Sequence, residues 1–275
     1  MCTFKSWTTA LLLGGLLYSS PLMAGGIFTG PVSTYFLTDS VNNTIYGVQG
    51  TSVVENFPMV YGTSSQELPI AISNSTIRTT GHDPGLQGGQ YTMNGTPTGP
   101  VFANLALGHL GDGTSDGTRN YYVPWTTAGS DAVYATDLNW QNPRILFNLP
   151  AGGYEGITYD HDNNSIWVSG YGNNLLADYS LSGTLLFAFN TQTPMMSALS
   201  YDPEDHTLWF TLYGSNLLEQ YSTTGVHLQE GVPTGLPNNP FAGGEQAVPE
   251  PGSLSLIGLG AVLVCCGRLR RHARQ

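Results

Sequence analysis

The chain has 275 residues, of which 11% are aromatic and 35 are glycine, a composition typical of many short strands joined by tight turns. Between Gly25 and Val248, 18 acidic residues stand against three arginines, which leaves a net charge of −15. A domain this negative repels phosphate backbones, so we expect no nucleic-acid partner. The charge either serves solubility outside the cell or attracts a divalent cation such as calcium, and we expect no other cofactor.

Residues 1–24 have the pattern of a secretory signal peptide. Lys5 supplies the positive start, residues 10–18 form a short apolar core, and cleavage is expected between Ala24 and Gly25. The core is too short to span a bilayer stably. We therefore expect export and a mature domain over residues 25–247. The chain's cysteines all lie in the terminal segments, so this domain has no disulfide.

The mature domain opens with three expected strand segments, over residues 34–39, 42–48 and 51–57. They correspond to the second, third and fourth strands of a four-stranded unit whose first strand is missing. Residues 242–248 resemble residues 151–157, which begin a later unit, and are therefore the candidate for the missing strand. A strand borrowed from the far end of the chain closes a ring and removes an exposed sheet edge.

Residues 67–149 follow the least regular pattern. Strands expected over residues 68–73, 76–79 and 90–93 form a second unit, and residues 101–107 are expected to open a third. Further along, we interpret Asp112-Gly113-Thr114-Ser115-Asp116-Gly117 as a turn before a strand at residue 120. Its alternating oxygen-bearing side chains would also suit calcium, although the distal glutamate of an EF-hand is missing.

Residues 154–231 contain one sequence twice, with a period of 42 residues. The shift lays Tyr159 on Tyr201, Trp167 on Trp209 and Tyr171 on Tyr213. Each copy has four short strands separated by Asn, Asp and Gly turns, and a repeat of this length is typical of a propeller blade. The length of the mature domain predicts an all-β propeller of about five four-stranded blades, and six shorter blades would also fit.

The repeat also resembles those of NHL and SMP-30 propellers, in the segments 154–160 and 173–176. For SMP-30-like lactonases this resemblance implies a catalytic divalent metal, held near the channel by several acidic and amide side chains. The candidate metal ligands in this chain are Asp112, Asp116 and Glu155. By contrast, Asp160 and Asp202 recur in both copies, which favours turn capping over chemistry.

The C-terminal residues 248–275 carry the most specific motif. Pro249-Glu250-Pro251 precedes an apolar run over residues 253–264 and a basic end with Arg268, Arg270 and Arg271. This arrangement resembles the PEP-CTERM sorting signal of Gram-negative bacteria. The resemblance implies a transmembrane helix that holds the precursor in the inner membrane, and cleavage near the Pro-Glu-Pro motif by an exosortase-type membrane protease. The product would reach the periplasm, outer envelope, cell surface or extracellular matrix. An ordinary membrane anchor is the alternative.

These patterns predict an exported propeller without enzymatic activity, and the PEP-CTERM resemblance implies a link to exopolysaccharide or a surface protein in biofilms. Trp125 and Trp140 do not fit the repeat and are candidates for an exposed aromatic platform against sugar rings. The histidines show no metal-ligand spacing. The rival function is a metal-dependent hydrolase of the lactonase or esterase type, which requires three or more acidic or amide side chains at one channel mouth.

Overall fold

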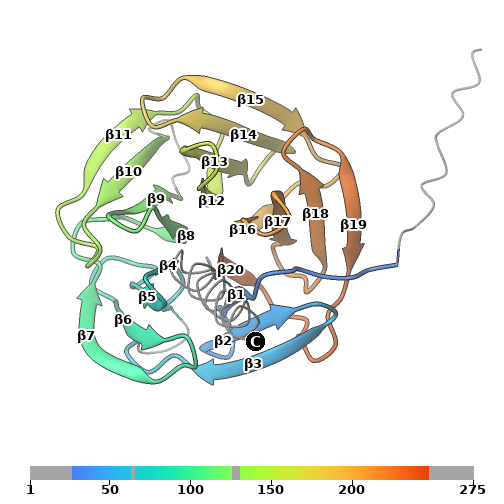
Figure 1. The fold of residues 1–275 in the computed structure, drawn as a ribbon. Helices are drawn as coiled ribbons and strands as arrows, with labels where there is room; N and C mark the ends of the chain where they lie inside the picture. Colours follow the sequence, from blue (N-terminus) through green and yellow to red (C-terminus); the bar gives the residue numbers. More distant parts are fainter. Residues whose placement is uncertain (1–26, 63–65, 126–130, 248–275) are drawn as a thin grey trace, which may run out of the picture.

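The computed structural model describes residues 27–62, 66–125 and 131–247. In these residues, twenty strands form five four-stranded antiparallel sheets, arranged as blades around a central axis (Figure 1). The expected five-bladed all-β propeller is therefore confirmed. The expected cleavage site at Ala24 and Gly25, the Pro249-Glu250-Pro251 motif and the basic end at Arg268, Arg270 and Arg271 lie outside the described residues. The described part of the chain contains no helix long and apolar enough to cross a membrane.

The four strands of each blade follow one another from the axis to the rim. The first blade contains β20 (Phe241–Gln246), β1 (Tyr35–Asp39), β2 (Thr44–Gln49) and β3 (Ser52–Pro58). The second contains β4 (Ile70–Ser73), β5 (Thr76–Thr79), β6 (Gln87–Thr92) and β7 (Pro97–Ala103). The third contains β8 (Leu110–Ser115), β9 (Asn120–Pro124), β10 (Ala132–Thr136) and β11 (Arg144–Asn148). The fourth contains β12 (Tyr154–Asp160), β13 (Ser165–Gly170), β14 (Leu175–Ser180) and β15 (Leu185–Asn190). The fifth contains β16 (Met196–Asp202), β17 (Thr207–Leu212), β18 (Leu218–Ser222) and β19 (His227–Gly231).

The C-terminal strand β20 closes the ring, as the sequence predicted. It pairs antiparallel with β1, so that Gln246 lies opposite Tyr35 and Phe241 lies opposite Asp39. The pairing continues one residue beyond the strand, where the Ala247 N–H donates to the Thr34 carbonyl at 2.9 Å. The first and the last strand of the described chain therefore belong to one sheet, in which β20 pairs with the inner edge of β1.

The inner strand of the third blade differs from the prediction. Residues 97–103 form β7, the rim strand of the second blade, and no strand of the third blade begins at residue 101. The third blade begins with β8, so residues 112–115 lie in a fully buried strand and not in a turn. A Cβ on Gly113 would lie 2.5 Å from the Trp140 ring, and one on Gly111 would lie 2.8 Å from Glu155 Cγ. The small residues that usually signal a turn are required here because neighbouring strands and side chains approach closely.

The hydrophobic core is distributed between the blades. Trp167 of the fourth blade packs in a cluster with Met196 and Leu199 of the fifth, and Trp209 of the fifth packs in a cluster with Leu37 of the first. The repeated tryptophans are therefore core residues between neighbouring blades. Trp140 is also buried, at 1% exposure, in the cluster between the second and third blades, so its prediction as an exposed platform is wrong.

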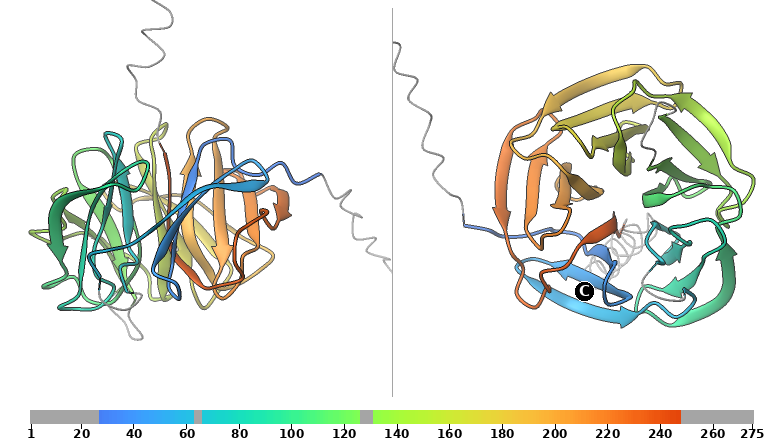
Figure 2. Two further views of the ribbon diagram at one scale, coloured as in Figure 1. Left: turned by 90° about the horizontal axis from the view of Figure 1, so that it is seen from below. Right: turned by 180° about the vertical axis from the view of Figure 1, so that it is seen from behind.

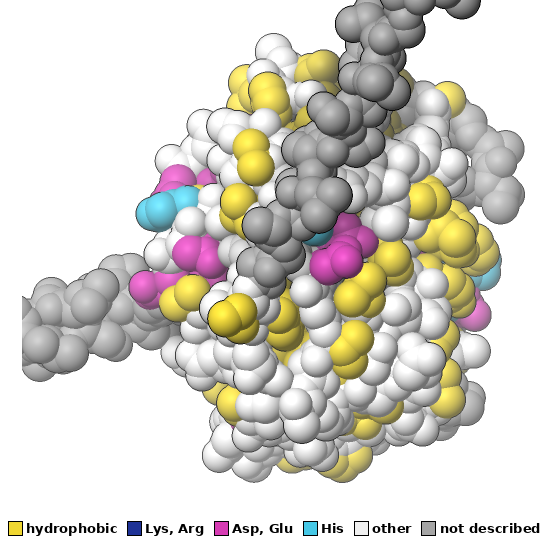
Figure 3. Space-filling view, turned by 90° about the vertical axis from the view of Figure 1, so that its right-hand side faces the viewer, with side chains coloured by type: hydrophobic (Ala, Val, Ile, Leu, Met, Phe, Trp, Pro, Cys, Tyr) yellow, Lys and Arg dark blue, Asp and Glu magenta, His cyan; other side chains and the backbone are white. Residues whose placement is uncertain are grey.

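The rim strands face solvent. On β15, the side chains of Leu185, Leu186 and Phe187 are all exposed. On the flank that carries β18 and β19, acidic and hydrophobic side chains lie side by side, and no Lys or Arg side chain is visible among the described residues (Figure 3). This surface agrees with the strongly negative charge of the sequence.

Candidate functional site

The propeller has two faces, which the side view separates (Figure 2, left). We call the face where β12 begins and β13 ends the pocket face, and the face where β12 ends at Asp160 and β20 ends at Gln246 the exit face. Ala242, at the start of β20, lines the pocket, so β20 runs from the pocket face to the exit face. The chain therefore leaves the propeller toward residue 248 on the exit face, away from the pocket.

Three aromatic residues form a row on the pocket face. Trp125, Tyr171 and Tyr213 directly follow β9, β13 and β17, the second strands of three successive blades. The rings of Trp125 and Tyr171 are edge to face at 6.0 Å, and those of Tyr171 and Tyr213 at 5.8 Å. Trp125 is 41% exposed and Tyr213 is 43% exposed. Trp125 thus occupies the blade position of the two repeated tyrosines, which corrects the interpretation that it falls outside the repeat.

The row borders a small pocket at the channel mouth. The pocket holds about 90 Å³ of solvent-accessible space. All five blades, with the segments that connect them, contribute to its lining, which consists of Ser40, Leu68, His82, Gly111, Trp125, Glu155, Tyr171, Tyr213 and Ala242. The arrangement is an apolar and aromatic recess with few polar groups, as is typical of ligand sites.

Glu155 is the carboxylate of this pocket. It is the second residue of β12 and is 6% exposed, and its Oε2 has no hydrogen-bond partner among the described residues. Burial raises the pKa of Glu155 to about 8. Near neutral pH this carboxyl therefore carries a proton in most molecules and can donate a hydrogen bond to an oxygen of a ligand.

Asp112 lies below the pocket, among four of the five inner strands. Its Oδ1 accepts hydrogen bonds from the N–H groups of Gly113 and Gly244, both at 2.8 Å. Its Oδ2 accepts from Ile157 N–H at 3.2 Å and Leu199 N–H at 2.9 Å. Burial raises the pKa of Asp112, and the four N–H donors act against this rise. A carboxylate offers about four acceptor positions, so Asp112 joins the strands and has little capacity left for a cation.

Asp116 lies at the other end of β8, toward the exit face. Its Oδ1 accepts from the N–H groups of Thr118 and Arg119, each at 2.7 Å, and Tyr121 donates its hydroxyl to Oδ2 at 2.6 Å. These bonds lower the pKa of Asp116 even though burial opposes them. The structure therefore places Asp112, Asp116 and Glu155 in three different surroundings and does not bring them together as one ligand set.

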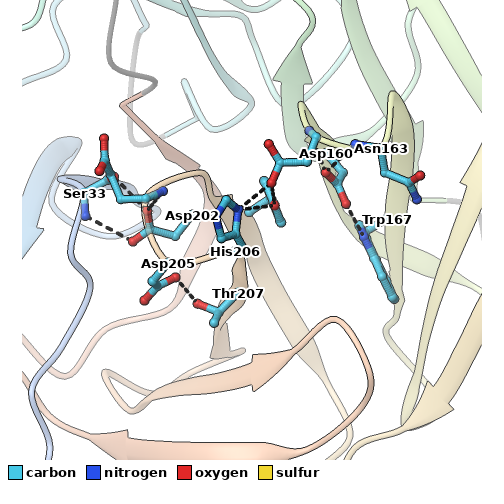
Figure 4. A network of polar contacts seen from close by, with 11 residues as sticks. Ser33, Asp160, Asn163, Trp167, Asp202, Asp205, His206 and Thr207 are labelled. Carbon is cyan, nitrogen blue, oxygen red and sulfur yellow. Dashed lines mark hydrogen bonds and ion pairs between the residues drawn. The ribbon is translucent and has the colours of Figure 1, made fainter. Parts of the chain in front are cut away.

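Asp160 and Asp202 cap turns on the exit face, as their recurrence in the repeat predicted (Figure 4). Asp160 Oδ1 accepts from the N–H groups of Asp162 and Asn163, at 3.0 and 3.1 Å. Asp202 Oδ1 accepts from Glu204 N–H at 3.0 Å and from the Ser33 hydroxyl at 2.7 Å. The second oxygen of Asp202 accepts from the N–H groups of residues 32 and 33 and from the side chain of residue 246. This carboxylate therefore ties the N-terminal segment and the closing strand to the fifth blade.

Two groups of His, Asp and Glu side chains lie close enough to share an ion in the part of the chain that the structure describes. One consists of His82, Asp83 and His109, and the other of Glu219, His227 and Glu230. Neither contains a ligand candidate from the sequence. Sequence spacing missed the first group because its two histidines are 27 positions apart, one in the loop between β5 and β6 and the other in the connection from β7 to β8.

Comparison with known proteins adds a sorting motif and a fold. Residues 247–271 match the PEP-CTERM protein-sorting motif. A comparison of the sequence with curated proteins gives no significant match. One similar solved structure is the crystal structure of a nidogen/laminin complex, with a TM-score of 0.53 and 15% sequence identity over 78% of this chain and 84% of that chain. Another is the crystal structure of a functionally unknown protein from Desulfotomaculum acetoxidans DSM 771, with a TM-score of 0.49 and 14% identity over 80% of this chain and 88% of that chain.

The chain is thus a five-bladed β-propeller protein with a PEP-CTERM sorting motif at its C-terminal end. The motif implies export, processing by an exosortase and sorting to the surface. At 15% identity, the similarity to the nidogen/laminin structure shows the fold alone.

Proposed function

We propose that this protein is a non-enzymatic binding protein of the cell surface or extracellular matrix, which holds exopolysaccharide at the aromatic row of the pocket face. The observation that carries this proposal is the row of Trp125, Tyr171 and Tyr213 beside the buried carboxyl of Glu155. Aromatic rings offer flat apolar faces to the C–H groups of a sugar, and a carboxyl offers hydrogen bonds to its hydroxyl groups.

The position of the row supports a role at a surface. The chain continues from Ala247 on the exit face into the PEP-CTERM motif, while the aromatic row lies on the opposite face. A protein held through its C-terminal segment would therefore present the row away from its attachment point. This orientation suits the capture of a polymer in the matrix.

The size of the pocket favours a polymer over an enclosed small molecule. Small-molecule sites commonly hold about 300–1,000 Å³. The pocket here holds about 90 Å³, with two exposed aromatic residues at its border. Such a recess accepts the edge of one ring of a longer chain that runs over the surface.

The pocket lining also supports binding over metal-dependent hydrolysis. A lactonase-type site requires several carboxylate or amide ligands at one mouth. Glu155 is the single acidic side chain of the pocket lining, and no Asn or Gln lies beside it there. A surface protein is the second candidate partner, since the structurally similar chain occurs in a nidogen/laminin complex.

The test measures binding of the purified protein to exopolysaccharide from the native host. We expect Tyr213→Ala to weaken binding about tenfold, because a lost aromatic contact costs about 1–1.5 kcal/mol. Phe187→Ala is the matched control, since Phe187 is also 43% exposed but lies on the rim strand β15. Equal binding by the two variants, or no retention of the wild type, would overturn the proposal.

A further inference from the structure

His82, Asp83 and His109 meet at the border of the pocket face. The His82 Nε2 lies 3.6 Å from Asp83 Oδ1, and the His109 Nδ1 lies 2.5 Å from the same oxygen. The two imidazole rings are 6.0 Å apart, edge to face. His82 also lines the pocket, so the group lies beside the aromatic row and off the propeller axis.

Hydrogen bonds hold the two loops of this group together. The Leu110 N–H donates to the His82 carbonyl at 2.9 Å, and the Trp125 N–H donates to the His109 carbonyl at 2.7 Å. The buried Asn104 side chain donates to Gly81 O at 2.9 Å and to Gly108 O at 2.8 Å. One amide thus joins the loop before His82 to the loop before His109, and the positions of the histidines do not depend on their contact with Asp83.

The hydrogen bonding of His82 sets its ring for metal binding. The His82 Nδ1 contacts the Leu110 carbonyl, and because a carbonyl only accepts, Nδ1 must carry the proton. Nε2 is then the ring nitrogen available to a metal ion, and it lies on the side of Asp83, 3.6 Å from Oδ1. Metal-binding histidines usually have this second bond to a carbonyl or carboxylate, which fixes the tautomer and the ring orientation.

The distances suit a tetrahedral ion. Zinc–nitrogen and zinc–oxygen bonds of about 2.0–2.1 Å place neighbouring ligand atoms roughly 3.3 Å apart. The ligand atoms of the three side chains all lie within 4.8 Å of one another. The contact between His109 and Asp83 is shorter than the ligand spacing, but the His109 side chain is 58% exposed and can turn without disturbing the core.

We propose that His82, Asp83 and His109 form a site for a divalent transition-metal ion of the zinc type. Two imidazoles and one carboxylate favour zinc over calcium, which prefers oxygen ligands. Three protein ligands leave a coordination position open beside the pocket, where an oxygen of a bound ligand could complete it. This inference does not depend on the proposed exopolysaccharide binding, and its test measures the ion alone.

The exit face supplies a matched control. There, His206 Nδ1 lies 2.5 Å from Asp162 Oδ2, the same spacing as between His109 and Asp83. Among the described residues, this pair has no third His, Cys, Asp or Glu ligand atom within 4.8 Å of both of its members. We would titrate purified full-length protein with Zn²⁺ by calorimetry, and compare the wild type with His82→Ala, His109→Ala and His206→Ala. Cys265 and Cys266 would bind Zn²⁺ as well. The informative quantity is therefore the difference in Zn²⁺ binding between the wild type and each variant.

We expect His82→Ala and His109→Ala each to lose at least about tenfold in Zn²⁺ affinity at one site, since even partners of metal ligands contribute 10- to 100-fold. His206→Ala should bind as the wild type does, and Ca²⁺ should give no comparable heat. Because His109 is exposed, His109→Ala should fold normally and still tests the site if His82→Ala folds poorly. Identical Zn²⁺ affinity in the wild type and in His109→Ala, or a preference for Ca²⁺, would overturn the site.

Discussion

The carboxylate of Asp112 accepts a hydrogen bond from the backbone N–H of Leu199, 2.9 Å away, across 87 residues of sequence and two blades. The N–H groups of Ile157 and Gly244, on two further inner strands, donate to the same carboxylate. Asp112 is fully buried, so water cannot replace it as the acceptor. One side chain therefore satisfies backbone donors at the centre of the ring that no strand pairing can reach.

The first prediction concerns this central carboxylate. Asp112→Ala leaves several buried N–H donors without an acceptor, and each costs about 1–3 kcal/mol. We expect the free energy of unfolding to fall by at least about 3 kcal/mol, measured by urea denaturation. Asp116→Ala is the control because Asp116 caps a partly exposed turn, and it should lose only about 1 kcal/mol. Equal losses in the two variants would contradict the central role of Asp112.

The second prediction concerns the pH dependence of stability at Glu155. Burial raises the pKa of Glu155 from 4.5 to about 8, so the folded state binds more protons than the unfolded state between these values. The stabilising contribution of this raised pKa is full below pH 4.5 and is lost as the pH rises through about 8. As the pH rises from 5 to 8, the free energy of unfolding of Glu155→Gln should therefore increase relative to that of the wild type, by on the order of 3 kcal/mol.

Urea denaturation of both proteins at several pH values measures this difference. Comparison with the wild type is necessary because burial also raises the pKa values of Asp112 and Glu245, which impose a pH trend of the same sign. Parallel curves for the wild type and Glu155→Gln would show that Glu155 has an ordinary pKa.

The third prediction concerns ring closure. Deletion of residues 240–248 removes β20, which pairs with β1 and contributes Phe241 to the core between the fifth and first blades. It also removes the Gly244 N–H from Asp112. We expect the whole domain to lose its cooperative thermal transition, because a blade face and a sheet edge are uncovered. A chain that ends at residue 248 keeps β20 and should melt as the full chain does. If the protein that lacks residues 240–248 keeps the thermal transition of the full chain, β20 does not close the propeller in solution.

The fourth prediction concerns sorting. Prolines on both sides of Glu250 disfavour a regular helix there, so the segment should stay extended and open to a protease. Replacement of Pro249, Glu250 and Pro251 by alanine should leave the precursor in the membrane without changing the melting of the propeller. Mass spectrometry of protein from the native host should find no residue after about Pro251. A mature species that retains Arg268 to Gln275 would instead indicate a permanent membrane anchor.

The sequence alone predicted a propeller of about five blades, the closing strand and the sorting motif, and the structure decided between five and six blades. Each of these has a signal that can be read along the chain. The blades have the repeat of 42 residues, the closing strand has the similarity of residues 242–248 to residues 151–157, and the sorting motif has its short sequence pattern. Tertiary structure decided the rest. Asp112 in a glycine-rich segment had the composition of a turn, and only the crowded packing of inner strands makes it a buried strand residue. Trp125 contacts Tyr171 because the ring places loops of neighbouring blades side by side. His82 meets His109 because the loop between β5 and β6 packs against the connection from β7 to β8. Spacing along the chain hid these contacts, because Trp125 lies 46 residues before Tyr171 instead of the 42 of the repeat, and His82 and His109 do not occupy repeated positions.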